Sequence, residues 1–133
     1  MKTIKFQIFS TLLILIFSLT SFSQNQAEVK AKIVLEDVEG NLKITGTAEN
    51  LSEIVKSLKY KLSVIRKNKN NNRTNNSQEG VFTLEPNQNK NLSTTQINRN
   101  TDDEIIILLL FYNENNEIVS KDRVVVNEEK KKM

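Results

Sequence analysis

The stretch that decides the fold is residues 58–93, LKYKLSVIRKNKNNNRTNNSQEGVFTLEPNQNKNLS, where two alternating runs flank an Asn-rich connection. In the first run Leu58, Tyr60, Leu62 and Val64 fall on one face of an extended chain. The positions between them carry mostly lysines and other polar residues. This period of two residues predicts a β-strand with one buried face.

The second run has the same period and a clear end. Phe82 and Leu84 point one way, Val81 and Thr83 point the other way, and Pro86 follows. Proline cannot donate a ladder hydrogen bond, so the strand is expected to stop before it. Because Asn tolerates left-handed backbone conformations, its abundance between the runs predicts a wide hairpin connection over residues 68–76.

The rest of the chain repeats the β pattern without a clear helix signal. Gly40-Asn41 is expected to be a turn, and residues 49–57 are expected to be a loop. The further strands are predicted at residues 27–35, 42–48, 90–98, 105–112 and 117–126. The sequence thus predicts an all-β fold, a seven-stranded antiparallel sandwich. Its predicted core contains Ile33, Leu35, Leu42, Ile44, Tyr60, Leu62, Val64, Phe82 and Leu84.

The first residues, 1–23, are typical of a signal peptide. Lys2 and Lys5 precede a nearly unbroken apolar run at residues 6–19, and small residues precede Gln24, where we expect cleavage. The alternative is an uncleaved anchor, but a run of about 14 residues is short for a bilayer that needs about 20. We therefore expect export and no stable membrane insertion after cleavage.

Cleavage would leave about 110 residues, enough for one domain with one modest core. We expect that domain at residues 24–127, followed by a charged disordered tail at residues 128–133. The formal net charge of +3 falls to about +1 once Lys2 and Lys5 are removed, so no nucleic-acid partner is predicted. The chain has no cysteine, so the exported fold must hold without disulfides.

Several kinds of chemistry are excluded by composition. The chain has no His, Cys or Trp, which removes His-dependent nucleophilic catalysis, thiol chemistry and zinc sites with His or Cys ligands. The acidic run at residues 102–104 lacks the spacing of a calcium loop. With only three glycines there is no Gly-rich phosphate loop either. We predict no metal, no cofactor and no enzymatic activity.

A basic cluster is the better candidate for a functional site. The outward positions of the first run and the connection after it contain Lys59, Lys61, Ser63, Ile65, Lys67 and Arg73. One interpretation is a solvated sheet face whose lysines prevent the addition of further strands. The other is a positive patch that makes fast, transient contacts with an unfolded client protein.

The order of the motif residues resembles that of the curli assembly chaperone family (the CsgC/CsgH proteins), and the CsgH type in particular. The matching residues are Tyr60, Leu62, Val64, Gln78, Gly80, Phe82, Leu84, Pro86, Leu92 and Ser93. The resemblance implies an immunoglobulin-like sandwich that acts in the periplasm. It also implies a transient partner, a curli-type amyloid subunit in an unfolded or early β-rich state. We expect a monomer.

Most motif residues are expected to serve the structure rather than client contact. Gly80 is expected where backbones approach closely or where a bulge re-aims the strand. Gln78 is expected to bond backbone groups of the Asn-rich connection. The leading functional hypothesis is a periplasmic chaperone that inhibits premature fibre formation by curli-type subunits. The alternative is a structural or adhesive immunoglobulin-like module of a cell-surface assembly.

Overall fold

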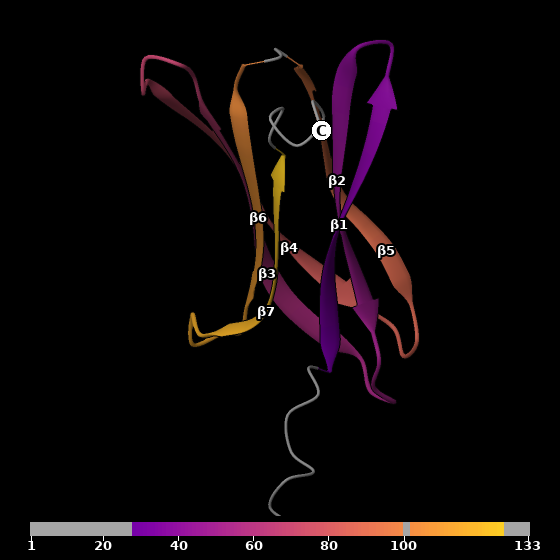
Figure 1. Ribbon diagram of the computed structural model, residues 1–133. Coiled ribbons are helices and arrows are strands. Elements are labelled where there is room, and N and C mark those ends of the chain that lie inside the picture. Colours follow the sequence, from indigo (N-terminus) through magenta and orange to yellow (C-terminus); the bar gives the residue numbers. More distant parts are fainter. Residues whose placement is uncertain (1–27, 100–101, 127–133) are drawn as a thin grey trace, which may run out of the picture.

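The computed structural model describes residues 28–99 and 102–126 as seven antiparallel β-strands in two sheets (Figure 1). The strands are β1 (Val29–Val38), β2 (Asn41–Asn50), β3 (Lys56–Lys67), β4 (Arg73–Leu84), β5 (Asn89–Asn98), β6 (Glu104–Tyr112) and β7 (Ile118–Val126). One sheet has the order β1-β2-β5 and the other has the order β4-β3-β6-β7. The predicted all-β sandwich is confirmed, and its layout is consistent with an immunoglobulin-like fold.

Two predicted segments lie outside the described residues. These are the signal peptide at residues 1–23 and the charged tail at residues 128–133. Within the described part, no helix has the length and apolar character needed to cross a membrane.

The first hairpin shows how local chemistry sets the strand register. Strands β1 and β2 pair without interruption from Val29 and Asn50 to Val38 and Asn41. Between them Glu39 and Gly40 have φ values of 51° and 83°, as two-residue turns of the mirror-image type require. The turn therefore begins one residue earlier than predicted, and the predicted turn residue Asn41 opens β2.

The second hairpin corrects the predicted Asn-rich connection. Strand β4 begins at Arg73, which pairs with Lys67, so the connection covers residues 68–72 rather than 68–76. The Asn68 side-chain oxygen accepts hydrogen bonds from the backbone amides of Asn70 and Asn72, each at 3.0 Å. The end of this hairpin extends beyond the body of the sandwich (upper left of Figure 1). Residues there are held by strand pairing rather than by burial, so they show no apolar period.

The core lies between the two sheets and follows the predicted alternation. Its buried apolar residues are Val29, Ala31, Ile33, Leu42, Ile44, Ala48, Leu62, Val64, Phe82, Leu84, Ile105, Ile107, Leu109 and Phe111. Seven of the nine predicted core residues are in this set, and the other two, Leu35 and Tyr60, pack at its margin. The Phe82 ring lies 4.9 Å from that of Phe111 and 6.2 Å from that of Tyr60, measured between centroids.

A buried amide secures the end of β2. Asn50 is 0% exposed, and its side-chain amide donates to the carbonyl oxygens of Ile54 at 2.8 Å and Glu85 at 3.1 Å. Its side-chain oxygen accepts the backbone amide of Ser52 at 3.0 Å. One side chain thus satisfies the short loop of residues 51–55 and the end of β4 together, as buried polar groups require.

The first and last strands meet along one side of the sandwich. The backbone amide of Ala31 donates to the Ser120 hydroxyl at 2.9 Å, and that of Ile33 donates to the Asp122 carboxylate at 2.8 Å. Strand β1 is an edge strand, and these amides would otherwise be open to a further strand. Side chains of β7 therefore satisfy two backbone amides of the β1 edge.

Candidate functional site

The candidate site is the outward face of the four-stranded sheet, where the described geometry gathers the predicted client-binding residues. Five of them lie on β3 and alternate outward, namely Lys59, Lys61, Ser63, Ile65 and Lys67. The sixth, Arg73, opens β4 and is the cross-strand partner of Lys67. The structure thus brings all six onto one hairpin.

Exposure differs among these residues. Lys59 is exposed, whereas Lys61, Ile65 and Lys67 are half-buried by neighbouring strands. Ser63 is only 7% exposed, and its hydroxyl lies 3.3 Å from that of Ser77 across the β3–β4 pair. The lysines can therefore reach solvent from this face, while Ser63 presents very little surface.

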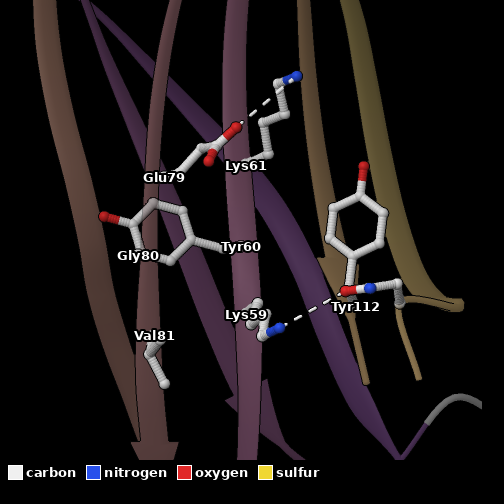
Figure 2. Close-up of a pocket in the computed structure, with 8 residues that line it drawn as sticks. Lys59, Tyr60, Lys61, Glu79, Gly80, Val81 and Tyr112 are labelled. Atoms are coloured by element: carbon white, nitrogen blue, oxygen red, sulfur yellow. Dashed lines mark hydrogen bonds and ion pairs between the residues drawn. The ribbon is translucent and has the colours of Figure 1, made fainter. Parts of the chain in front are cut away.

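A shallow open hollow of about 520 Å³ lies on this face over β3 and β4. Lys59, Lys61, Glu79, Val81 and Tyr112 are among the residues that line it (Figure 2). Val81 is 74% exposed and presents its apolar side chain to solvent. The hollow combines cationic ends with apolar walls, a combination that suits a chain carrying both apolar and acidic side chains.

Charges within the hollow are only partly neutralised. The Lys61 ammonium lies 3.8 Å from the Glu79 carboxylate, and the Lys59 ammonium donates to the Asn116 side-chain oxygen at 3.5 Å (Figure 2). Exposed pairs at such distances are worth about 0–1 kcal/mol, so either lysine can exchange its partner for another anion. Sequence reasoning missed Glu79, Tyr112 and Asn116, because their approach to Lys59 and Lys61 depends on strand order.

Gly80 has a specific steric role beneath the Tyr60 ring. A Cβ atom on Gly80 would lie 2.7 Å from Cε1 of Tyr60, and the ring crosses β4 at this point (Figure 2). The Tyr60 hydroxyl continues to β5, where it donates to the carbonyl oxygen of Leu92 at 3.4 Å. The β3–β4 register runs through Gly80 without a shift, so there is no bulge at this position. The close approach is made by the Tyr60 ring rather than by the expected second backbone.

The remaining motif residues surround the same seam. The Gln78 side-chain oxygen accepts a hydrogen bond from the Ser93 hydroxyl, which corrects the predicted bond to the Asn-rich connection. Phe82 and Leu84 are buried, and Pro86 lies in the turn between β4 and β5. The motif residues Tyr60, Gln78 and Gly80 thus join the two sheets on the side opposite the β1–β7 contact. This contact between the sheets was not evident from sequence, because the bonding partners, the Leu92 carbonyl and the Ser93 hydroxyl, belong to β5.

The described residues do not offer a metal site. Across residues 28–99 and 102–126, no group of three acidic, histidine or cysteine side chains is close enough to hold an ion. The acidic side chains after β5 are instead engaged with cations, Asp102 with Lys69 at 2.9 Å and Asp103 with Arg66 at 3.4 Å. The candidate face itself presents cationic and apolar side chains.

Comparison with known proteins relates this fold to two small structures. The E. coli curli protein CsgC matches with a TM-score of 0.57 and 13% sequence identity, over 71% of this chain and 96% of CsgC. CsgH of R. palustris matches with a TM-score of 0.52 and 14% identity, over 77% of this chain and 94% of CsgH. Both likenesses span nearly the whole of the smaller neighbour.

Other comparisons are less informative about this chain. A Bacteroides uniformis β-glucuronidase matches with a TM-score of 0.55 and 8% identity, but over only 14% of its own length. That partial likeness carries no activity to this chain. No protein-family model and no curated protein matches the sequence. The fold of this chain is CsgC/CsgH-like, as the motif resemblance predicted.

Proposed function

We propose that the mature protein is a periplasmic chaperone that transiently binds a curli-type amyloid subunit and inhibits its premature assembly into fibres. The fold likeness to CsgC and CsgH supports a curli-associated role, and the motif residues found at the β4–β5 seam agree with the resemblance. The observation that carries the proposal is the β3–β4 face, where Lys59 and Lys61 flank an open, partly apolar hollow.

The edges of the sandwich favour contact through this face rather than through strand addition. On one side, β7 side chains occupy backbone amides of the β1 edge. On the other, Tyr60 of β3 and Gln78 of β4 each hydrogen-bond to β5. A protein that handles β-prone chains benefits from such protection, because an open edge would itself template further strands.

Binding by exposed charges is fast and weak, which suits a monomeric chaperone acting below equimolar ratio. It can intercept rare nuclei or early β-rich conformers, release them and act again. The client is expected to carry carboxylates that meet Lys59, Lys61, Lys67 and Arg73.

The test is a fibre-formation assay with a purified curli-type subunit, followed by thioflavin fluorescence. We expect the mature protein to lengthen the lag at well below equimolar ratio. The variant K59E/K61E should shorten the lag again, while its circular dichroism and melting temperature stay close to those of the parent. Rising salt should also shorten it, since the Debye length falls from about 10 Å at 0.1 M to about 3 Å at 1 M.

The matched control is K30E/K32E, which makes the same charge change on exposed positions of β1 in the other sheet. It should inhibit as well as the parent does. An equal loss in both variants would mean that net charge, not this face, is responsible. A parent protein that leaves the lag unchanged would rule out the chaperone function.

A further inference from the structure

The outward side of β6 carries apolar residues that are not part of the buried core. Ile105, Ile107, Leu109 and Phe111 already fill the core, yet the alternate positions are also apolar. We call these alternate residues the β6 ridge: Ile106, Leu108, Leu110 and Tyr112. They are half-buried beside the neighbouring strands rather than packed beneath another layer.

The other sheet gives an internal comparison. Its interior strand is β2, whose outward positions include Lys43, Thr45 and Thr47. Thr45 faces Thr94 of β5, and the two hydroxyls lie 3.3 Å apart. An interior strand of this sandwich thus tolerates a polar outward face, as antiparallel sheets commonly do. The interior position of β6 in its sheet therefore does not by itself account for the apolar ridge.

Basic side chains border the ridge on both sides. Strand β6 lies between β3 and β7 (Figure 1), and Leu110 pairs with Lys61 on one side and with Lys121 on the other. Leu108 pairs with Arg123 on the β7 side, and Tyr112 pairs with Lys59 on the β3 side. Cross-strand partners share a face, so these cations project outward beside the ridge. With strands about 4.8 Å apart, the two basic columns are separated by about 10 Å.

The cations on the β7 side are available for a partner. Within the described part of the chain, Lys121 and Arg123 form no ion pair, and both are exposed. Asp122 between them points to the opposite face, where its carboxylate accepts the Ile33 amide. The long stems of Lys and Arg can cover apolar neighbours while the charged ends stay in water. They therefore shield the ridge in the free protein and can move aside for a bound chain.

We propose that the β6 ridge and its two basic columns bind one extended peptide segment in which carboxylates bracket apolar residues. Side chains of an extended chain alternate between its two sides, so carboxylates of one segment can reach both columns. Its apolar residues then rest on Leu108 and Leu110. This inference deepens the proposed function, on which it rests for the identity of the client, and extends the binding face from β3–β4 to β7.

The test uses peptides, so that it does not depend on fibre formation. The probe is a synthetic peptide of about eight residues, a length typical of one strand, in which pairs of adjacent glutamates bracket valines. Adjacent side chains point to opposite sides, so each glutamate pair offers one carboxylate to each column. The matched peptide has lysine in place of every glutamate. Amide shifts in the ¹⁵N-labelled mature protein are followed by NMR during titration. We expect the acidic peptide to shift residues of β3, β6 and β7 together, and the basic peptide to shift none of them.

Variants separate this site from the hollow over β3 and β4. Charge reversal in K121E/R123E should weaken the acidic peptide roughly tenfold, about as much as K59E/K61E does. The variant L110T, which keeps a strand-forming residue, should weaken the peptide without changing net charge. The control K30E/K32E should bind as the parent does. Unchanged affinity in K121E/R123E would overturn the proposal, as would peptide shifts confined to β3 and β4.

Failure of this inference and failure of the proposed function have different signatures. Peptide binding on the β6 ridge together with an unchanged fibre lag would keep the site and remove the chaperone function. A lengthened fibre lag that K121E/R123E leaves intact would keep the function and remove the site.

Discussion

Replacing Gly80 with alanine would force the Tyr60 ring out of its present position. The new Cβ would lie 2.7 Å from Cε1 and 3.1 Å from Cζ of that ring. Non-bonded carbon atoms prefer separations of about 3.5–4.0 Å, so the ring would have to move by roughly 1 Å. That movement would break the Tyr60 hydroxyl's contact with the Leu92 carbonyl, which is already long at 3.4 Å.

The expected cost follows from two opposing terms. Overpacking a well-packed site costs about 1–3 kcal/mol. Alanine loses less conformational entropy than glycine on folding, which stabilises the variant by about 0.5–1 kcal/mol. We therefore expect the free energy of unfolding to fall by up to about 2.5 kcal/mol. For a domain of this size each kcal/mol lowers the melting temperature by about 4–8 °C.

A double-mutant cycle identifies the cause. Urea unfolding, followed by circular dichroism, is measured for the parent, G80A, Y60L and the double variant. In the Y60L background, G80A should be neutral or slightly stabilising, because the atoms that clash are gone. Gly46→Ala is the control, since its Cβ would meet Leu109 at 3.2 Å and not Tyr60. If G80A costs the same in both backgrounds, the ring contact is not what requires glycine.

Two further substitutions test the interior. Phe82→Ala should lower the free energy of unfolding by about 3–5 kcal/mol in the same urea measurement, since the side chain is 4% exposed between two aromatic rings. An unchanged melting temperature would contradict its burial. Asn50→Ala should cost about 1–3 kcal/mol by leaving buried carbonyl groups without a donor. Asn50→Asp should be at least as damaging, because a carboxylate cannot donate to them, and a mild N50D would refute that account.

The strands and most of the core could be predicted because burial leaves a period of two in the sequence. Ile33, Leu62 and Phe82 each belong to a series of apolar residues at every second position, and each lies in the core as expected. The first half of β4 could not be found this way. Its residues from Arg73 onward are exposed on both sides and are ordered by pairing with β3, which leaves no apolar signature.

The candidate site was predictable only along single strands. Alternation places Lys59 and Lys61 outward on β3, and the structure agrees. It cannot place Lys121 on the same face, because that depends on the order β3-β6-β7. The link from Tyr60 to Leu92 was hidden for the same reason, since it joins residues of different sheets. Contacts between strands distant in sequence are set by the whole topology, which local pattern does not encode.

The β1–β7 contact also has a consequence for the order of folding. Its two hydrogen bonds each join residues 89 positions apart, nearly the full span of the domain. Closing a chain segment of that length costs about 4 kcal/mol of entropy, on the order of (3/2)RT ln n. The ribosome makes β1 first and β7 last. The two β1 amides therefore cannot form these hydrogen bonds until the final strand has been made. Until then the β1 edge of the nascent protein lacks the β7 side chains that bond it in the folded protein, and it is open to pairing with another strand.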